Sequence, residues 1–202
     1  MRVLVFDFDG VISDSAETHV KIFNSLCRKY GLSPVKDVKE YGKLFGKNFY
    51  ESLVMFGLKR AMIPEFSRNF MENCFKEKIH LFHGTKEMIE SLSDKNNISI
   101  VTGNQTEFVK KNLGENGISH IKEIMGVDKG ISKVEKLSFL KKKFPGEDVY
   151  FIGDTTGDMK EGKEASVKTV AVTWGIHSKE ELRKENPDYV VDSVRELEAL
   201  FR

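Results

Sequence analysis

A chain of 202 residues, 40% of them hydrophobic, is long enough to bury one sizeable core with room for a smaller insert. The 32 lysines and arginines nearly balance the 31 aspartates and glutamates, and the net charge of +1 excludes the bias typical of nucleic-acid or membrane-surface proteins. Cys27 and Cys74 lack metal or redox spacing, so we expect buried thiols in a reducing compartment. The sequence shows no signal-peptide pattern and no apolar run that could span a bilayer, which predicts a cytoplasmic protein with no membrane and no nucleic acid as partner.

The chain opens on a short apolar run, residues 2–6, that ends in Asp7-Phe8-Asp9-Gly10. Such a run indicates a strand that is buried on both faces, as in a parallel sheet. Side chains alternate along an extended chain, so Asp7 and Asp9 would start on one side of it. Two carboxylates at such a short distance repel each other unless a cation or a shared proton lies between them. An acidic turn closed by a glycine is the ordinary alternative interpretation.

The next stretch, from residue 14 to residue 81, shows helical periodicity and little strand signal. Asp14 and Ser15 are candidate caps for its first helix, which Gly31 would end. Apolar stripes recur through the stretch and are punctuated by glycine and proline, which is typical of a small helical bundle. We therefore expect an all-α insert over residues 14–81, directly after the first strand. We call it the helical insert.

From residue 82 onward, short apolar segments alternate with amphipathic helical patterns. This alternation predicts an α/β fold, a doubly wound parallel sheet with helices on both faces. The α/β core would comprise residues 1–13 and 82–202. Ser178 and Glu181 form a capping box at the start of one helix. After the first strand, the expected strands span residues 97–102, 121–127, 148–153, 168–173 and 189–191.

Polar and charged residues follow four of these strands, and the carboxyl ends of parallel strands meet at one edge of a sheet. Taken singly, each has an ordinary explanation as a helix cap or a solvated side chain. Together they offer oxygen ligands for Mg²⁺, a carboxylate nucleophile, and donors for phosphate oxygens, which indicates phosphoryl transfer. The residues are Asp7, Asp9, Thr102, Gly103, Lys133, Asp154 and Asp158.

At these residues the chain resembles the haloacid dehalogenase superfamily. Its four motifs are matched in order by Asp7-Phe8-Asp9-Gly10, by Thr102, by Lys133, and by Gly153-Asp154 with Asp158 four positions after Asp154. The helical insert resembles the cap of the phosphoglycolate phosphatase-like branch. So do the segments Phe82-His83-Gly84 and Thr173-Trp174-Gly175-Ile176-His177. The resemblance spans nearly the whole chain and implies a Rossmann-like core.

The resemblance also implies a role for each residue of the set. Asp7 would be the nucleophile, and Asp9 would protonate the leaving oxygen and then activate water. Thr102, the amide of Gly103 and the ammonium of Lys133 would bind the phosphate. The ligands of Mg²⁺ would be Asp7, the backbone carbonyl of Asp9, Asp154 and Asp158.

The phosphate-binding lysine has rivals in the sequence. The branch often has a proline directly after this lysine, whereas Val134 follows here. Lys129 and Lys136 lie nearby and could fill the same role. Ser132 favours Lys133, because a serine cap would place this lysine at the start of a helix near the edge of the sheet.

Three residues of the helical insert are candidates for substrate selection. The resemblance points to residues 45–48 as facing the site, where Lys47 beside Asn48 could meet a second anionic group of the substrate. A solvated lysine beside a flexible glycine is the alternative. His19 is a further candidate, against the simpler interpretation of a histidine on a helix surface.

These features favour a Mg²⁺-dependent phosphatase that hydrolyses small phosphate monoesters, phosphoglycolate-like first of all, through an aspartyl-phosphate. Asp9 argues against a dehalogenase, which would not be expected to keep a second aspartate. A phosphosugar mutase or a phosphonate-cleaving enzyme of the same fold remains an alternative. So does a phospho-acceptor regulatory protein, in which the aspartyl-phosphate would be long-lived. The partner would be a small phosphorylated metabolite, and the sequence leaves both its identity and the choice between monomer and homodimer open.

Overall fold

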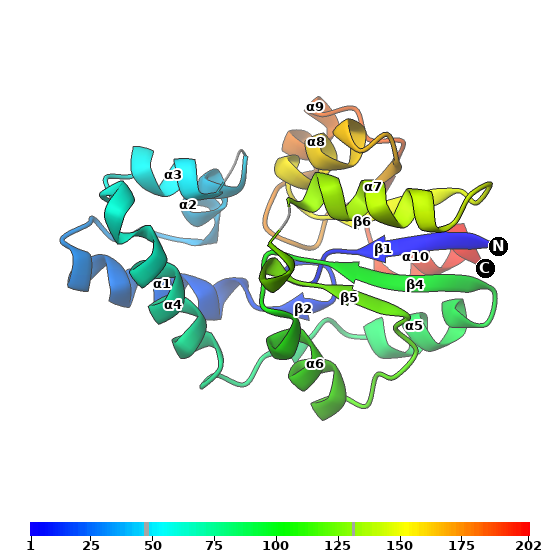
Figure 1. Cartoon of the computed structure of the whole chain (residues 1–202), viewed down its shortest axis with the longest axis horizontal. Helices are drawn as coiled ribbons and strands as arrows, with labels where there is room; N and C mark the ends of the chain where they lie inside the picture. The colour runs from blue at the N-terminus through cyan, green and yellow to red at the C-terminus, as the bar shows by residue number, and fades with distance from the viewer. Residues whose placement is uncertain (47–48, 131) are drawn as a thin grey trace.

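The protein is built around one six-stranded sheet, seen in a computed structural model that describes residues 1–46, 49–130 and 132–202 (Figure 1). The strand order is β5-β4-β1-β6-β7-β8, and every neighbouring pair is parallel. The expected doubly wound α/β fold is confirmed. The strands are β1 (Arg2–Phe6), β4 (Asn96–Val101), β5 (Glu123–Met125), β6 (Val149–Gly153), β7 (Lys168–Val172) and β8 (Tyr189–Val191).

Strand β1 lies in the middle of the sheet, between β4 and β6. Leu4 and Phe6 pack into the larger hydrophobic core, whereas Val3 and Val5 pack into a second core. Because successive side chains of a strand point to opposite faces, β1 is covered on both faces. This explains why its sequence is apolar throughout and does not alternate with polar residues.

Helices cover both faces of the sheet (Figure 1). Side chains of α5, α6 and α10 join the core of Leu4 and Phe6, and those of α7 join the core of Val3 and Val5. The capping box of Ser178 and Glu181 is present, as predicted. The helices are α5 (Thr85–Ser93), α6 (Thr106–Glu115), α7 (Lys133–Lys143), α8 (Thr156–Glu164), α9 (Lys179–Lys184) and α10 (Val194–Phe201), with a 3-10 turn η3 (Val127–Lys129).

The chain leaves and re-enters the α/β core through a short antiparallel pair, β2 (Ser13–Asp14) and β3 (His80–Leu81). Between β2 and β3, all the regular secondary structure of the described residues is helical. The division into a core (1–13 and 82–202) and a helical insert (14–81) stays an interpretation, and the β2–β3 pair lies across its boundary. The elements are α1 (Ala16–Tyr30), α2 (Val38–Gly42), η1 (Lys43–Phe45), α3 (Phe49–Met55), η2 (Arg60–Met62) and α4 (Ile63–Cys74).

Aromatic packing holds the helical insert together. The ring of Phe23 on α1 is fully buried and contacts the rings of Tyr41, Phe56 and Phe66. Such aromatic pairs add to the stabilisation that burial of the rings provides. Both cysteines are buried and free, as expected. Among the described residues, no helix is long and apolar enough to cross a membrane.

Candidate active site

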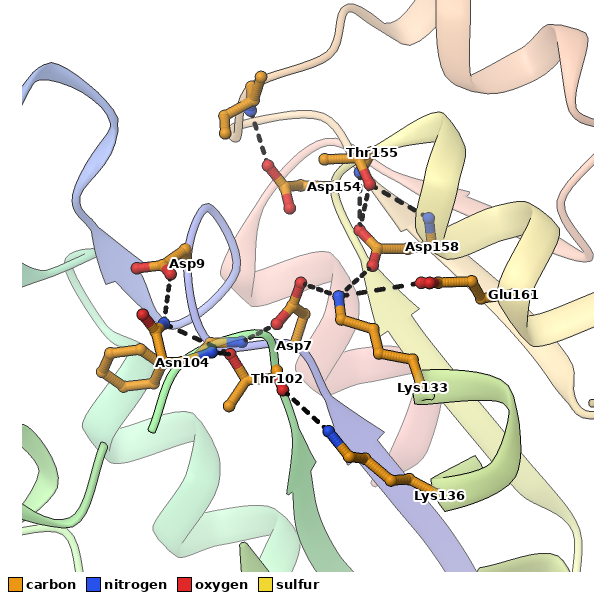
Figure 2. Close-up of polar contacts among 12 residues, drawn as sticks. Asp7, Asp9, Thr102, Asn104, Lys133, Lys136, Asp154, Thr155, Asp158 and Glu161 are labelled. Carbon is orange, nitrogen blue, oxygen red and sulfur yellow. Dashed lines mark hydrogen bonds and ion pairs between the residues drawn. The ribbon is translucent and has the colours of Figure 1, made fainter. Parts of the chain in front are cut away.

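The polar residues predicted at the strand ends do meet at one edge of the sheet (Figure 2). Asp7 follows β1, Thr102 follows β4, and Asp154 follows β6, and these three strands are adjacent. Lys133 is the first residue of α7, where Ser132 caps the helix by accepting from the backbone N–H of Glu135. The cap that the sequence predicted therefore sets the position of the lysine.

The ammonium group of Lys133 lies among the carboxylates of the site (Figure 2). Its Nζ lies 2.7 Å from Oδ2 of Asp7 and 2.8 Å from Oδ1 of Asp158. The carboxylate of Glu161 lies 4.0 Å away on another side. The side chain of Lys133 is only 17% exposed, so these ion pairs are screened less by water than surface pairs. One ammonium thus faces three carboxylates.

A second set of three carboxylates, which includes Asp154 in place of Glu161, could hold a divalent cation. Ligand oxygens of Asp7, Asp154 and Asp158 all lie within 4.8 Å of one another. Oδ2 of Asp154 accepts from the backbone N–H of Ile176 at 2.8 Å, whereas the buried Oδ1 of Asp154 has no hydrogen-bond partner. Oδ2 of Asp158 accepts from the hydroxyl of Thr155 at 2.6 Å, which fixes its orientation. Carboxylate oxygens are the ligands that Mg²⁺ prefers, and Oδ1 of Asp154 is a buried acceptor that a bound ion would satisfy.

Burial and neighbouring carboxylates raise the pKa values of two aspartates of the site. Burial raises the pKa of Asp7 to about 7, although the ammonium of Lys133 lowers it. Burial and the neighbouring Asp158 raise the pKa of Asp154 well above its usual range. Burial also acts to raise the pKa of Asp158, but Lys133 and the Thr155 donors hold it below its ordinary value. Added positive charge would therefore favour the ionised form of Asp7 and Asp154.

Two glycines give the carboxylate of Asp154 its space. Gly10 has a φ of +72°, and a Cβ on it would lie 2.0 Å from Oδ2 of Asp154. A Cβ on Gly175 would lie 2.3 Å from the same oxygen. Without a side chain, Gly10 permits both the left-handed backbone conformation after the two aspartates and this close approach.

Asp9 is held by donors that the sequence did not identify. Its Oδ1 accepts from the hydroxyls of Ser13 at 3.0 Å and Ser15 at 2.6 Å, and its Oδ2 accepts from the side-chain amide of Asn104. Ser15 occupies the N-cap position of α1, as expected, but its hydroxyl donates to Asp9 and makes no capping bond. Asn104 directly follows the predicted Thr102-Gly103, and that position was the one available signal.

The phosphate-binding residues that the resemblance implied lie beside these carboxylates. Thr102 is buried, and its Oγ1 accepts from the backbone N–H of Asn104 at 3.2 Å. Gly103 is exposed at the edge of the sheet. Of the rival lysines, Lys136 is buried and donates to the backbone carbonyl of Thr102 at 3.4 Å, and Lys129 is exposed on η3. Lys133 donates directly to Asp7, which supports the role expected for it.

Of the three candidates for substrate selection in the helical insert, the structure describes His19. His19 is buried, so its interpretation as a helix-surface histidine is wrong. Its ring packs edge-on against Phe70 of α4, and its Nε2 lies 3.9 Å from Oδ1 of Asp9 with no hydrogen-bond partner. Lys47 and Asn48 lie outside the described residues.

Comparison with known proteins supports the same family. Residues 4–172 match the family described as haloacid dehalogenase-like hydrolase. The chain is 24% identical to the phosphoglycolate phosphatase of Synechococcus elongatus, over 98% of this chain and 95% of that protein. It is 23% identical to the N-acetylmuramic acid 6-phosphate phosphatase of Pseudomonas aeruginosa, over 98% of this chain and 93% of that protein.

The fold has solved counterparts as well. A haloacid dehalogenase-like family hydrolase from Streptococcus pneumoniae superposes with a TM-score of 0.81 at 21% identity, covering 100% of this chain and 99% of that chain. The family match and the named relatives confirm the expected resemblance, including its phosphoglycolate phosphatase-like branch, and the expected class of enzyme, a phosphatase. The solved structure confirms the fold.

Proposed function

The chain belongs to the haloacid dehalogenase-like hydrolase family, and we propose that it is a Mg²⁺-dependent phosphatase of small phosphate monoesters. The observation that carries this proposal is the cluster of Asp7, Asp158 and Lys133 beside the orphaned carboxylate oxygen of Asp154. It combines a buried nucleophile, a cation for phosphate oxygens and a set of ligands for a metal ion.

The metal would be held by the carboxylates of Asp7, Asp154 and Asp158, with the backbone carbonyl of Asp9. Mg²⁺ bound there would neutralise charge on the phosphate and on the carboxylates. Burial raises the pKa values of Asp7 and Asp154, so a bound cation would stabilise the ionised form of both carboxylates. Asp158 would remain ionised throughout, because Lys133 and Thr155 stabilise its charge.

In the first half-reaction, an oxygen of Asp7 attacks the phosphorus and the bond from phosphorus to the ester oxygen breaks. The phosphoryl group passes to Asp7, and Asp9 gives a proton to the departing ester oxygen. Lys133 and Thr102, with the amide of Gly103, stabilise the charge on the phosphoryl oxygens. The contact of 2.7 Å between Lys133 and Asp7 supports a lysine that can touch both nucleophile and phosphate.

In the second half-reaction, Asp9 takes a proton from a water molecule that attacks the same phosphorus. The bond between phosphorus and Asp7 breaks, inorganic phosphate leaves, and both carboxylates return to their starting state. Asp9 is suited to this exchange because its side chain is 22% exposed, whereas that of Asp7 is 11% exposed. Its hydrogen bonds to Ser13 and Ser15 also connect it to the entry of the helical insert.

The substrate we propose is a small, acidic, phosphoglycolate-like ester. The named activities of the relatives support the class, since one is a phosphoglycolate phosphatase and another acts on N-acetylmuramic acid 6-phosphate. The unpartnered Nε2 of His19 near Asp9 could donate to a second polar group of such a substrate. Lys47 and Asn48 stay candidates for the same task.

A panel of phosphorylated compounds tests this proposal. Phosphate release is measured with Mg²⁺ for small acidic phosphate esters, sugar phosphates, pyrophosphate and a phosphonate. The proposal expects the highest kcat/KM for a small acidic ester. Conversion of a sugar phosphate to its isomer, release from the phosphonate, or a stable phosphoryl group on Asp7 without turnover would instead support the mutase, the phosphonate-cleaving enzyme or the regulatory protein.

A further inference from the structure

The loop after β7, residues 173–177, connects three parts of the site. The backbone N–H of Ile176 donates to Oδ2 of Asp154 at 2.8 Å. The indole N–H of Trp174 donates to the carbonyl of Val11 at 3.2 Å, just before the chain enters the helical insert. His177, at the end of the loop, reaches the insert itself through its side chain. The reaction described above assigns no role to His177.

The ring of His177 is buried and uses both of its nitrogens. Nδ1 lies 2.8 Å from the backbone N of Thr156, in the first turn of α8. Because a backbone N–H can only donate, Nδ1 accepts, and the proton of the neutral ring is on Nε2. Nε2 then donates to the carbonyl of Gly42 at 2.8 Å. One ring thus joins the helix that carries Asp158 to the end of α2 in the helical insert.

The packing around this bond is close on both sides. A Cβ on Gly42 would lie 2.7 Å from Cγ2 of Ile176 and 3.3 Å from Cδ2 of His177. The adjoining turn of the insert also meets α8, where Nζ of Lys160 donates to the carbonyl of Gly46 at 2.9 Å. The insert therefore rests on α8 and on the loop after β7 through its residues 42–46.

We propose that His177 is a positioning residue that holds the helical insert against the carboxylate site through its bond to Gly42. This inference rests on the proposed function, in which residues of the helical insert select the substrate. The two bonds of the ring have separate consequences. The bond to Thr156 lies within the α/β core, whereas the bond to Gly42 must break if the insert moves away.

Two matched variants separate these bonds. In His177→Asn, the amide oxygen stands as many bonds from Cβ as Nδ1 does, so it can accept from Thr156 but cannot reach Gly42. In His177→Gln, the amide nitrogen stands as many bonds from Cβ as Nε2 does, so it can still donate to Gly42. Both variants replace the ring with an uncharged polar side chain, and circular dichroism checks that each is folded.

Hydrogen exchange measured by mass spectrometry on the whole protein is the primary readout. For His177→Asn we expect faster exchange in peptides covering residues 38–46, with little change in the first turn of α8. His177→Gln should restore exchange at residues 38–46 toward the wild-type rate. Loss of one hydrogen bond predicts a rise in KM of about threefold to tenfold for His177→Asn, a smaller change in kcat, and unchanged affinity for Mg²⁺.

The result that would overturn the inference is wild-type exchange at residues 38–46 in His177→Asn, or equal effects of the Asn and Gln variants. Hydrogen exchange and Mg²⁺ binding are both measured without turnover. They can therefore disprove the role of His177 independently of the proposed function. If the wild-type protein hydrolyses no ester while the two variants still differ in exchange, the proposed function fails and the role of His177 stands.

Discussion

Lys133 and Asp7 are 126 positions apart in the chain, yet Nζ of Lys133 lies 2.7 Å from Oδ2 of Asp7. The same nitrogen lies 2.8 Å from Oδ1 of Asp158. A buried ammonium shared by two carboxylates leaves both of them uncompensated when it is removed. The role of this lysine can therefore be tested by substitution.

Lys133→Met should lower kcat/KM by a factor of about 10²–10³, because one donor to the phosphoryl oxygens is lost. It should also lower the melting temperature of the metal-free protein, since Asp7 and Asp158 then repel each other without a shared cation. Lys136→Met is the matched control. Lys136 is buried, donates to a carbonyl, and has its pKa lowered by burial, so an apolar replacement should cost far less activity. A larger loss of activity in Lys136→Met than in Lys133→Met would show that Lys136, and not Lys133, binds the phosphate.

Asp7→Asn should abolish turnover while the fold is retained. The amide keeps the size of the side chain but is not a nucleophile for phosphorus, and we expect a loss of at least about 10³-fold in kcat. Phosphate release and circular dichroism measure the two properties on the same preparation. Near-normal turnover in a folded Asp7→Asn variant would remove Asp7 from the role of nucleophile.

Asp9→Asn should discriminate between esters by their leaving groups. If Asp9 protonates the departing oxygen, its loss should slow alkyl phosphates much more than an aryl phosphate, whose leaving group needs little protonation. The comparison is the ratio of kcat for the two esters in the variant and in the wild type. A uniform loss for both esters would indicate that Asp9 acts mainly through its backbone carbonyl or through its hydrogen bonds to Ser13 and Ser15.

Binding of Mg²⁺ should strengthen as the pH rises from about 5.5 to 8. Burial raises the pKa of Asp7 to about 7 in the folded, metal-free protein, so below that pH a proton competes with the ion. The unfolded chain loses this proton near its ordinary pKa of 3.8, so the free energy of unfolding of the metal-free protein should fall as the pH rises from 3.8 toward 7. Melting temperatures with and without Mg²⁺ across this range measure both effects. A Mg²⁺-induced shift that is the same at pH 5.5 and pH 8 would contradict the expectation.

Gly175→Ala should weaken the response to Mg²⁺. The added Cβ would lie 2.3 Å from Oδ2 and 2.4 Å from Cβ of Asp154, so that side chain must move. Gly114→Ala is the control, because a Cβ there would meet nothing within 4 Å and alanine favours the helix α6 by about 0.5–1 kcal/mol. The readout is the Mg²⁺-induced shift in melting temperature. An unchanged shift in Gly175→Ala would mean that Asp154 is not a ligand.

The sequence predicted the sheet and the strand-end residues because both follow from local patterns. An apolar run that ends in Asp7 and Asp9, and a serine in front of Lys133, are visible without any knowledge of tertiary contacts. The β2–β3 pair was missed, since strands of two residues carry no periodicity. The burial of His19 was also missed, because it depends on Phe70 of α4, far along the chain.

The surroundings of Asp9 show the same limit. Ser15 looked like a helix cap, and only the folded chain brings its hydroxyl to Asp9. Asn104 reaches Asp9 across 95 positions of sequence, and its place directly after Thr102-Gly103 was the only local sign of this contact. The boundaries of the helical insert, the roles of the site residues, a cytoplasmic location and the choice between monomer and homodimer stay predictions.

The most direct measurement is phosphate release by the purified wild-type protein from a generic aryl phosphate and a small acidic ester, with Mg²⁺ and then with EDTA. The central claim is a phosphatase whose carboxylates act with Mg²⁺. It predicts release with Mg²⁺, loss of that release in EDTA, and its return when Mg²⁺ is restored. Release that continues unchanged in EDTA, or no release from any ester with Mg²⁺ present, would contradict it.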